Sequence, residues 1–180
     1  MELPFIYKYQ PLILDDFEYE EELLLLIRTL IKMDNLNIIF IGDSGCGKTS
    51  LINVIIREYY GKEPQNDNIL RINSLKDQGI TYYRNDVKIF CQTSSSIIGK
   101  KKILILDDID NINEQSQQVF RNCIDKYSHN VHFISSCNNS QKVIDSIQSR
   151  LSVIKIKAPH DTNLIKVINK ISDKENILLD

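Results

Sequence analysis

An apolar segment that runs directly into a glycine-rich loop constrains this chain more than any other feature. Residues 36–41 read Leu-Asn-Ile-Ile-Phe-Ile, as in a buried β-strand, and residues 42–49 follow as Gly-Asp-Ser-Gly-Cys-Gly-Lys-Thr. An amphipathic helix is predicted from about Lys48 to Tyr60. Glycines allow backbone N–H groups to surround phosphate oxygens, and the helix N-terminus adds partial positive charge. The order strand, loop, helix therefore predicts a phosphate-binding loop.

The same loop predicts ligands for a nucleotide and its metal ion. We expect Lys48 to reach the outer phosphates and the Thr49 hydroxyl to bind Mg²⁺. The alternative, a glycine-rich turn with a chance lysine, leaves the flanking strand and helix unexplained. The predicted nucleotide-binding residues of the loop are Gly42, Asp43, Ser44, Gly45, Cys46, Gly47, Lys48, Thr49 and Ser50.

Alternating apolar and amphipathic segments predict an α/β fold with a parallel sheet. The expected strands are 36–41, 69–73, 103–106, 131–136 and 152–157. The expected helices are 20–33, 48–60, 80–92, 113–127 with Asn113 as its N-cap, 141–147 and 161–171, and residues 1–17 are expected to be irregular. Ligands of such sheets bind at the carboxyl ends of the strands, where both the loop and Asp107 fall.

Two acids, Asp107 and Asp108, follow the predicted strand 103–106. Facing a phosphate loop, Asp107 would bind Mg²⁺ directly or through water, and Asp108 would orient or deprotonate the attacking water. A solvated pair of acids at a strand end is the alternative for these two residues. Asp110 is either a third acid of the site or a solvated residue, and we favour the second.

Composition and charge restrict the classes of function. The chain has 180 residues, enough for one domain with a substantial core, and a net charge of −2, so any DNA contact must come from a local patch. No apolar run is long enough to span a membrane, and residues 1–4 open no signal peptide, so we expect an intracellular protein. The four cysteines form no Cys-x-x-Cys pair. His129 and His132 are expected to be a solvated pair rather than metal ligands.

Five short segments, spread over nearly the whole chain, resemble the motifs of one family in the family's order. They are 7–11 (Tyr-Lys-Tyr-Gln-Pro), 72–80 (Ile-Asn-Ser-Leu-Lys-Asp-Gln-Gly-Ile), 107–110 (Asp-Asp-Ile-Asp), 136–138 (Ser-Cys-Asn) and 149–151 (Ser-Arg-Leu). The family is that of the clamp-loader small subunits of the replication factor C type, which are AAA+ ATPases. The resemblance implies a P-loop AAA+ core at 1–158, a three-layer α/β/α sandwich with a five-stranded parallel sheet. The start of a small helical lid would follow at 159–180.

The resemblance also implies roles for individual residues. Tyr9 and Pro11 would lie against the adenine of ATP. Asn138 would hold the attacking water or the terminal phosphate, and Arg150 would act in trans on the ATP of a neighbouring subunit. The implied catalytic residues are Asp108, Asn138 and Arg150.

The implied function is to open a sliding clamp with ATP and load it at primer–template junctions during DNA replication. The implied partners are sibling subunits in a hetero-oligomeric ring, the clamp and primer–template DNA, in the nucleus or at a cytoplasmic replication site. Two other functions stay open here: a non-hydrolysing structural subunit that donates Arg150 to a neighbour, or another AAA+ replication protein such as an initiator or helicase loader.

Several residues depart from the family pattern. The catalytic Glu of the family is Asp108 here, one methylene shorter, so slow hydrolysis is expected. Gln10 and Gln78 replace arginines, and Leu151 replaces a cysteine. A basic family residue near 93–96 is a serine here, which leaves direct DNA contact open. Lys100, Lys101 and Lys102 either supply charge for such a contact or form a solvated turn.

Overall fold

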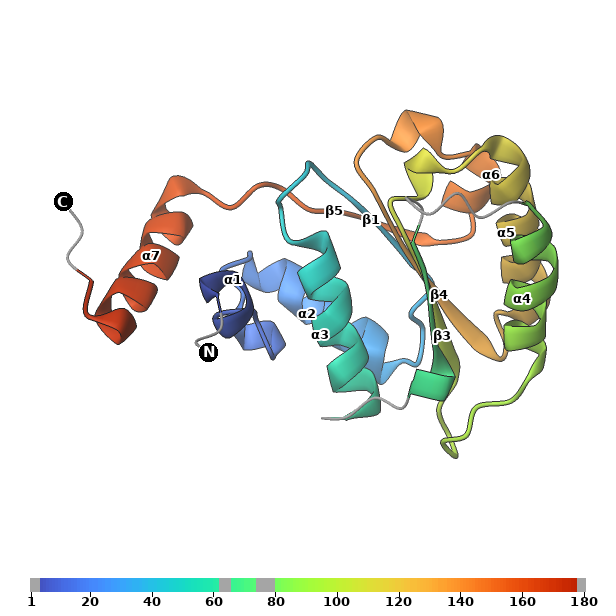
Figure 1. The fold of residues 1–180 in the computed structure, drawn as a ribbon, viewed down its shortest axis with the longest axis horizontal. Coiled ribbons are helices and arrows are strands. Elements are labelled where there is room, and N and C mark those ends of the chain that lie inside the picture. Colours follow the sequence, from blue (N-terminus) through green and yellow to red (C-terminus); the bar gives the residue numbers. More distant parts are fainter. Residues whose placement is uncertain (1–3, 62–65, 74–79, 178–180) are drawn as a thin grey trace.

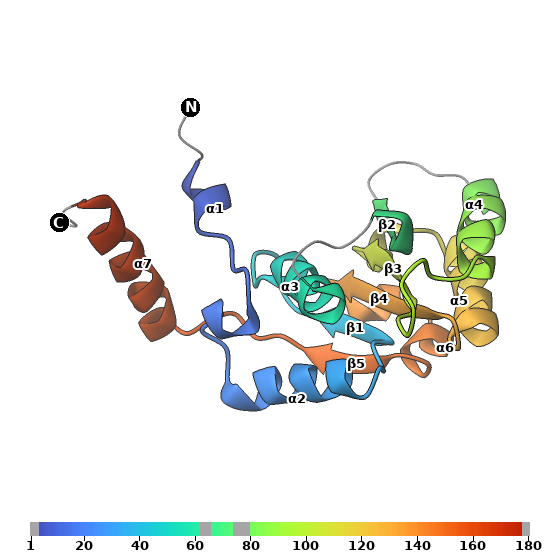
Figure 2. The ribbon, with the colours of Figure 1, turned by 90° about the horizontal axis from the view of Figure 1, so that it is seen from below.

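The computed structural model describes residues 4–61, 66–73 and 80–177. Within them, five parallel strands form one sheet in the order β2-β3-β4-β1-β5 (Figures 1 and 2). The strands are β1 (Ile38–Ile41), β2 (Ile69–Asn73), β3 (Lys102–Asp107), β4 (Val131–Cys137) and β5 (Ser152–Lys155). The helices are α1 (Phe5–Lys8), α2 (Glu21–Lys32), α3 (Lys48–Tyr60), α4 (Ile80–Gln92), α5 (Glu114–Tyr127), α6 (Asp145–Gln148) and α7 (Asp161–Glu175). The predicted five-stranded parallel sheet is confirmed.

Helices cover both faces of the sheet, so the predicted three-layer sandwich is also confirmed. Figure 1 shows α2 and α3 on one face and α4, α5 and α6 on the other. The side chains of β1 alternate between two apolar clusters: Ile38 and Phe40 pack with α2 and α3, whereas Ile39 packs with the cluster that contains Phe120 of α5. Burial on both faces explains why the strands read as continuous apolar runs.

The last helix, α7, extends away from the sheet and lies near the N-terminal segment (Figure 1). Glu175 of α7 accepts hydrogen bonds from the side chains of Lys8 and Tyr9. Asn163 Nδ2 donates to the carbonyl of Glu18 at 2.8 Å. Four large apolar side chains of α7 are 40–54% exposed, namely Leu164, Ile165, Val167 and Ile168.

The predicted helix at 141–147 is wrong, because this segment forms a 3₁₀ turn (Ser140–Lys142) followed by the separate helix α6. Gln117 of α5 explains the break. Its side-chain amide donates to the carbonyl of Lys142 at 2.9 Å and accepts from the N–H of Ile144 at 2.9 Å. These backbone groups therefore have partners outside a helix.

Other boundaries differ less from the prediction. Residues 1–17 contain α1 and a 3₁₀ turn at Leu14–Asp16, β1 and β5 are shorter than expected, and α7 runs on to Glu175. The predicted N-cap is confirmed: Asn113 Oδ1 accepts a hydrogen bond from the N–H of Ser116 at 2.8 Å. Residues 74–79, which include Gln78 and most of one family-like segment, lie outside the described residues. Among the helices described, none has the length and apolar character needed to cross a membrane.

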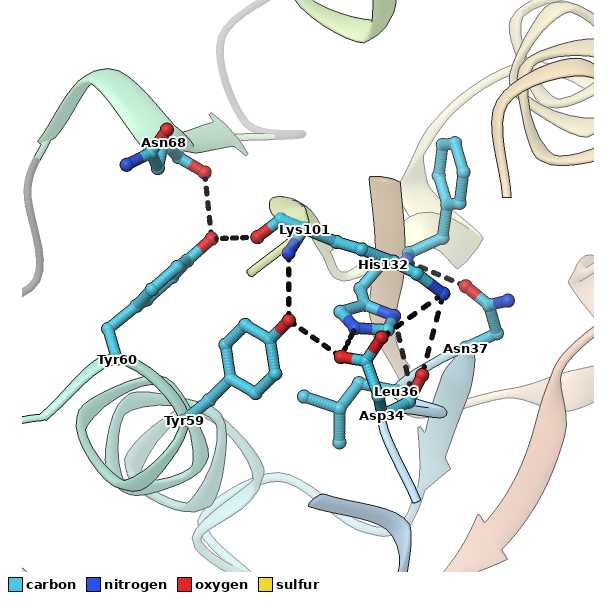
Figure 3. A network of polar contacts seen from close by, with 9 residues as sticks. Asp34, Leu36, Asn37, Tyr59, Tyr60, Asn68, Lys101 and His132 are labelled. Atoms are coloured by element: carbon cyan, nitrogen blue, oxygen red, sulfur yellow. Dashed lines mark hydrogen bonds and ion pairs between the residues drawn. The ribbon is translucent and has the colours of Figure 1, made fainter. Parts of the chain in front are cut away.

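His132 is buried at the start of β4, so the predicted solvated histidine pair is wrong for this residue (Figure 3). Its Nδ1 accepts a hydrogen bond from the N–H of Leu36 at 3.3 Å, and its Nε2 lies 3.0 Å from Asp34 Oδ1. Because Nδ1 acts as the acceptor, the proton of the neutral ring is on Nε2, which donates to Asp34. Burial lowers the pKa of His132, although the neighbouring Asp34 opposes this shift.

The same polar network holds the end of α3 (Figure 3). The hydroxyl of Tyr59 donates to Asp34 Oδ1 at 2.7 Å and accepts from the N–H of Lys101 at 2.9 Å. The hydroxyl of Tyr60 donates to the carbonyl of Lys101 at 2.7 Å. Burial raises the pKa of Asp34, but hydrogen bonds from Tyr59 and His132 outweigh it, and the net shift is downward. The network thus ties the helix that begins at the glycine-rich loop to the N-terminal edge of the sheet.

Of the lysines at 100–102, Lys100 is exposed, but Lys102 is not part of a solvated turn. Lys102 is only 6% exposed, its ammonium donates to Thr93 Oγ1, and burial lowers its pKa. Ser96 Oγ accepts from the side chain of Asn68 at 2.7 Å. Two hydroxyls and one ammonium that could have met DNA phosphates therefore have hydrogen-bond partners within the chain.

We predict that His132 makes the stability of the fold depend on pH. The unfolded chain takes up a proton on this side chain near pH 6.5, whereas the buried ring in the folded state takes it up only at lower pH, because its pKa is lowered. The free energy of unfolding should therefore fall by up to about 1.4 kcal/mol for each pH unit between about 6.5 and the lower pKa of the folded state. The stabilisation from Asp34 is lost only at lower pH, as its carboxylate is protonated.

Urea unfolding of the wild type and of His132→Gln between pH 7.5 and pH 5 measures this effect, with pH values on both sides of about 6.5. His132→Gln should be less stable overall but should lose less stability on acidification. His129 is exposed, so His129→Gln serves as the matched control and should keep the wild-type pH dependence. Equal pH dependence in wild type and His132→Gln would contradict the assignment.

Candidate nucleotide-binding site

The glycine-rich loop connects the carboxyl end of β1 to the first turn of α3, as predicted. Gly45 and Gly47 have φ angles of +81° and +92°, which glycine adopts far more readily than other residues. A Cβ on Gly42 would lie 2.4 Å from the carbonyl oxygen of Ile156, so this position also requires glycine. Asp43 and Ser44 are exposed at the tip of the loop. The loop is therefore built to present backbone rather than side chains.

The ammonium group of Lys48 lies inside the loop. Its Nζ donates to the carbonyls of Gly42 and Asp43 and to Asn138 Oδ1, each at 2.8 Å. The side chain reaches Asn138 because β4 lies between β1 and β3 in the sheet, so the carboxyl end of β4 adjoins the loop. The predicted proximity of Asn138 to the loop and the acids follows from this strand order.

Thr49, at the end of the loop, and Asp107, at the end of β3, bring two oxygen atoms together. Thr49 Oγ1 donates to Asp107 Oδ2 at 3.0 Å, across the edge of the sheet. Hydroxyl and carboxylate oxygens are the ligands that Mg²⁺ prefers, so this pair fits the metal ion predicted from the sequence.

Asp108 follows β3 in a left-handed backbone conformation, with φ +53°. Its carboxylate lies 3.5 Å from Asn138 Nδ2. Burial raises the pKa of Asp108, and the negative charges of Asp107 and Asp110 raise it further. The structure thus gathers Asp107, Asp108 and Asn138 at one end of the sheet, as expected from the sequence.

Asp110 is not merely solvated, contrary to the prediction. Its Oδ2 accepts hydrogen bonds from the N–H groups of Asn138 and Asn139 at 3.2 and 3.0 Å. Asn139 in turn caps the following turn, with its Oδ1 accepting from the N–H of Gln141 at 2.9 Å. Asp110 therefore holds the segment that carries Asn138. This role is visible only in the structure, because Asp110 follows β3 and its partners follow β4, the neighbouring strand in the sheet.

A cavity of about 450 Å³ opens beside the loop. Its walls come from the N-terminal segment, the loop and α7, and they include Tyr9, Pro11, Gly45, Cys46, Gly47, Ser50, Asn163, Leu164 and Val167. Tyr19, which the sequence analysis did not single out, also lines it and donates from its hydroxyl to the carbonyl of Cys46 at 2.6 Å. Cys46 itself is 4% exposed. The predicted adenine contacts Tyr9 and Pro11 thus lie in one cavity with the loop.

Arg150 lies away from these residues. It precedes β5, which is parallel to β1. Arg150 therefore lies at the N-terminal ends of these strands, whereas the loop lies at their carboxyl ends. Its guanidinium forms an ion pair with Asp125 of α5 and donates to the carbonyl of Ser146 at 2.7 Å. The hydrogen bond from Arg150 lowers the pKa of Asp125. The loop, the acids after β3 and Asn138 therefore come together without a contribution from Arg150 of the same chain.

Comparison with protein families matches residues 38–158 to "ATPase family associated with various cellular activities (AAA)". The chain belongs to the AAA family of ATPases. The matched range begins at β1 and ends beyond β5, so it contains the loop, both acids, Asn138 and Arg150.

Curated relatives carry replication factor C names. The chain is 33% identical over 178 residues to a replication factor C small subunit of Methanosphaera stadtmanae, covering 98% of this chain and 55% of the relative. It is 31% identical over 179 residues to replication factor C subunit 4 of Saccharomyces cerevisiae, again covering 98% and 55%. The chain thus spans about half the length of the curated relatives that it matches.

Solved structures share the fold at low sequence identity. The Holliday junction branch migration motor RuvB from Thermotoga maritima matches with a TM-score of 0.69 at 16% identity, covering 93% of this chain and 55% of that one. AMPPCP-bound DnaA from Aquifex aeolicus matches with a TM-score of 0.68 at 16% identity, covering 94% and 57%. These likenesses confirm the P-loop AAA fold and carry no further argument about function.

Proposed function

We propose that this AAA chain is the ATP-binding and hydrolysing part of a sliding-clamp loader subunit of the replication factor C type. One observation carries the proposal: Lys48, Thr49, Asp107 and Asn138 converge at the end of the sheet in a chain whose replication factor C relatives align over nearly its whole length. The replication factor C names also favour this function over that of an initiator, because the likeness to DnaA is one of fold.

ATP would bind with its adenosine in the 450 Å³ cavity, against Tyr9 and Pro11, and its phosphates in the loop. The Lys48 ammonium, which now donates to loop carbonyls and Asn138, would turn to the outer phosphates. Thr49 and Asp107 would hold Mg²⁺, which would neutralise charge on the phosphates when bound. The backbone N–H groups of residues 45–49 would complete the phosphate contacts.

Hydrolysis would use the acid beside the Mg²⁺ ligand. Asp108 would orient or deprotonate the attacking water, and Asn138, held between Lys48 and Asp110, would position that water or the terminal phosphate. Arg150 would leave Asp125 and reach the ATP of a neighbouring subunit, where it would stabilise the charge that develops in the transition state.

The proposed assembly is a hetero-oligomeric ring of sibling subunits that opens the clamp and loads it at primer–template DNA, inside the cell. Residues 1–158 would form the ATPase core and 159–180 the start of the helical lid. The exposed apolar side chains of α7 support a lid that packs against further helices. ATP binding between subunits would set the shape of the ring, and hydrolysis would release the clamp.

Affinity purification of the tagged chain from its native source, with primed DNA and ATPγS, tests this function. Sibling ATPases and a ring-shaped clamp should co-purify, and clamp recovery should fall at least tenfold with Lys48→Ala, because the loop loses its phosphate-binding charge. Lys126→Ala, which changes an exposed lysine of α5, is the matched control and should recover the clamp as the wild type does. Purification without sibling ATPases and clamp would contradict the proposed function.

We further predict that hydrolysis is slow because the Asp108 side chain is one methylene shorter than the glutamate in the family motif. Asp108→Glu should raise steady-state phosphate release by on the order of tenfold, equivalent to about 1.4 kcal/mol of activation free energy. Asp145→Glu lengthens an exposed acid of α6 and should leave the rate unchanged. An Asp108→Glu rate equal to or below that of the wild type would contradict the prediction.

A further inference from the structure

A buried serine connects the two acids at the end of β3. Ser136 of β4 is 0% exposed. Its Oγ donates a hydrogen bond to Asp107 Oδ1 and accepts one from the backbone N–H of Asp108 at 3.0 Å. One hydroxyl therefore contacts both residues to which the proposed function assigns metal binding and catalysis.

The two oxygens of the Asp107 carboxylate have different partners. Oδ1 accepts from Ser136 on the sheet side, and Oδ2 accepts from Thr49 on the loop side at 3.0 Å. Because a carboxylate is planar, a hydrogen bond that fixes Oδ1 also fixes the direction in which Oδ2 points. Ser136 thus aims Oδ2 at the Thr49 hydroxyl.

The second hydrogen bond acts on the backbone. Asp108 adopts the left-handed conformation, with φ +53° and ψ +52°, which is uncommon for residues other than glycine. Its N–H has Ser136 Oγ as a partner, so the turn after β3 is anchored to β4 at this residue. The direction of the chain beyond Asp107 therefore depends on the same hydroxyl.

The neighbouring serine provides an internal contrast. Ser135 is also 0% exposed, yet its Oγ has no hydrogen-bond partner among the residues that the structure describes. The two adjacent buried hydroxyls of β4 thus differ in that only Ser136 contacts the acids.

We propose that Ser136 is a positioning residue that orients Asp107 for Mg²⁺ and sets the backbone from which Asp108 projects. This inference rests on the proposed function, since it concerns the Mg²⁺ ligands of that site. Partners that orient a metal ligand typically change metal affinity by about 10- to 100-fold when they are removed. Ser136 should therefore control the affinity for Mg²⁺ more than the affinity for the nucleotide.

Titration of Mg²⁺ into the full chain with a fluorescent ATP analogue (mant-ATP) tests the proposal. Ser136→Ala should raise the Mg²⁺ concentration at half-saturation by about 10- to 100-fold, with mant-ATP affinity in EDTA unchanged. Ser135→Ala removes an equally buried hydroxyl that contacts neither acid and should keep the wild-type midpoint.

Ser136→Cys keeps an atom at the position of the hydroxyl but replaces the oxygen with a larger sulfur that hydrogen-bonds only weakly, so it removes the hydrogen bonds without leaving a gap. It should shift the Mg²⁺ midpoint in the same direction as Ser136→Ala, and it serves alone if Ser136→Ala does not fold. A wild-type midpoint in a folded Ser136 variant, or an equal shift in Ser135→Ala, would overturn the inference while leaving the proposed function intact. Absence of any Mg²⁺-dependent mant-ATP binding by the wild type would instead overturn the proposed function.

Discussion

The position of β4 between β1 and β3 is the constraint on which the rest of the site depends. Parallel pairing brings the carboxyl ends of these strands to one edge, where the loop after β1, the acids after β3 and Asn138 after β4 meet. The hydrogen bond from Lys48 to Asn138 is the direct consequence, since it joins residues 90 positions apart in the chain. With a different strand order, the loop after β1 and the acids after β3 would not lie on either side of Asn138.

The helix that begins at the loop is fixed at both ends. Gly47 starts α3 in a left-handed conformation beside the phosphate loop, and Tyr59 and Tyr60 end it in the Asp34–His132 network. The network lies at the N-terminal ends of the strands, opposite the site, and in it the half-exposed carboxylate of Asp34 provides a hydrogen-bond partner for the buried side chains of Tyr59 and His132. α3 is thus held by contacts at both ends, which suits a helix that carries a loop whose ligands must keep their spacing.

Local sequence patterns predicted the features that depend on neighbours along the chain. The strand–loop–helix at 36–60, the Asn113 cap and the acids at the end of β3 all follow from adjacent residues. His132 and Asp110 were predicted wrongly as solvated, and the alternative of a solvated turn is wrong for Lys102, because their partners come from other elements. His132 lies 98 positions from Asp34 in the chain. The break in the helix predicted at 141–147 depends on Gln117, which accepts a hydrogen bond from the N–H of Ile144, 27 positions away. Sequence alone does not reveal such pairings before the strand order is known.

In the proposed function, the backbone N–H groups of the loop bind the phosphates of Mg·ATP. Amide hydrogen exchange of residues 45–49, measured with Mg²⁺ alone and with saturating Mg·ATP, tests it directly. Exchange at these amides should slow when Mg·ATP is added, while exchange in the buried strand at 131–135 should stay the same. Unchanged exchange at 45–49 in folded protein with Mg·ATP present would contradict it.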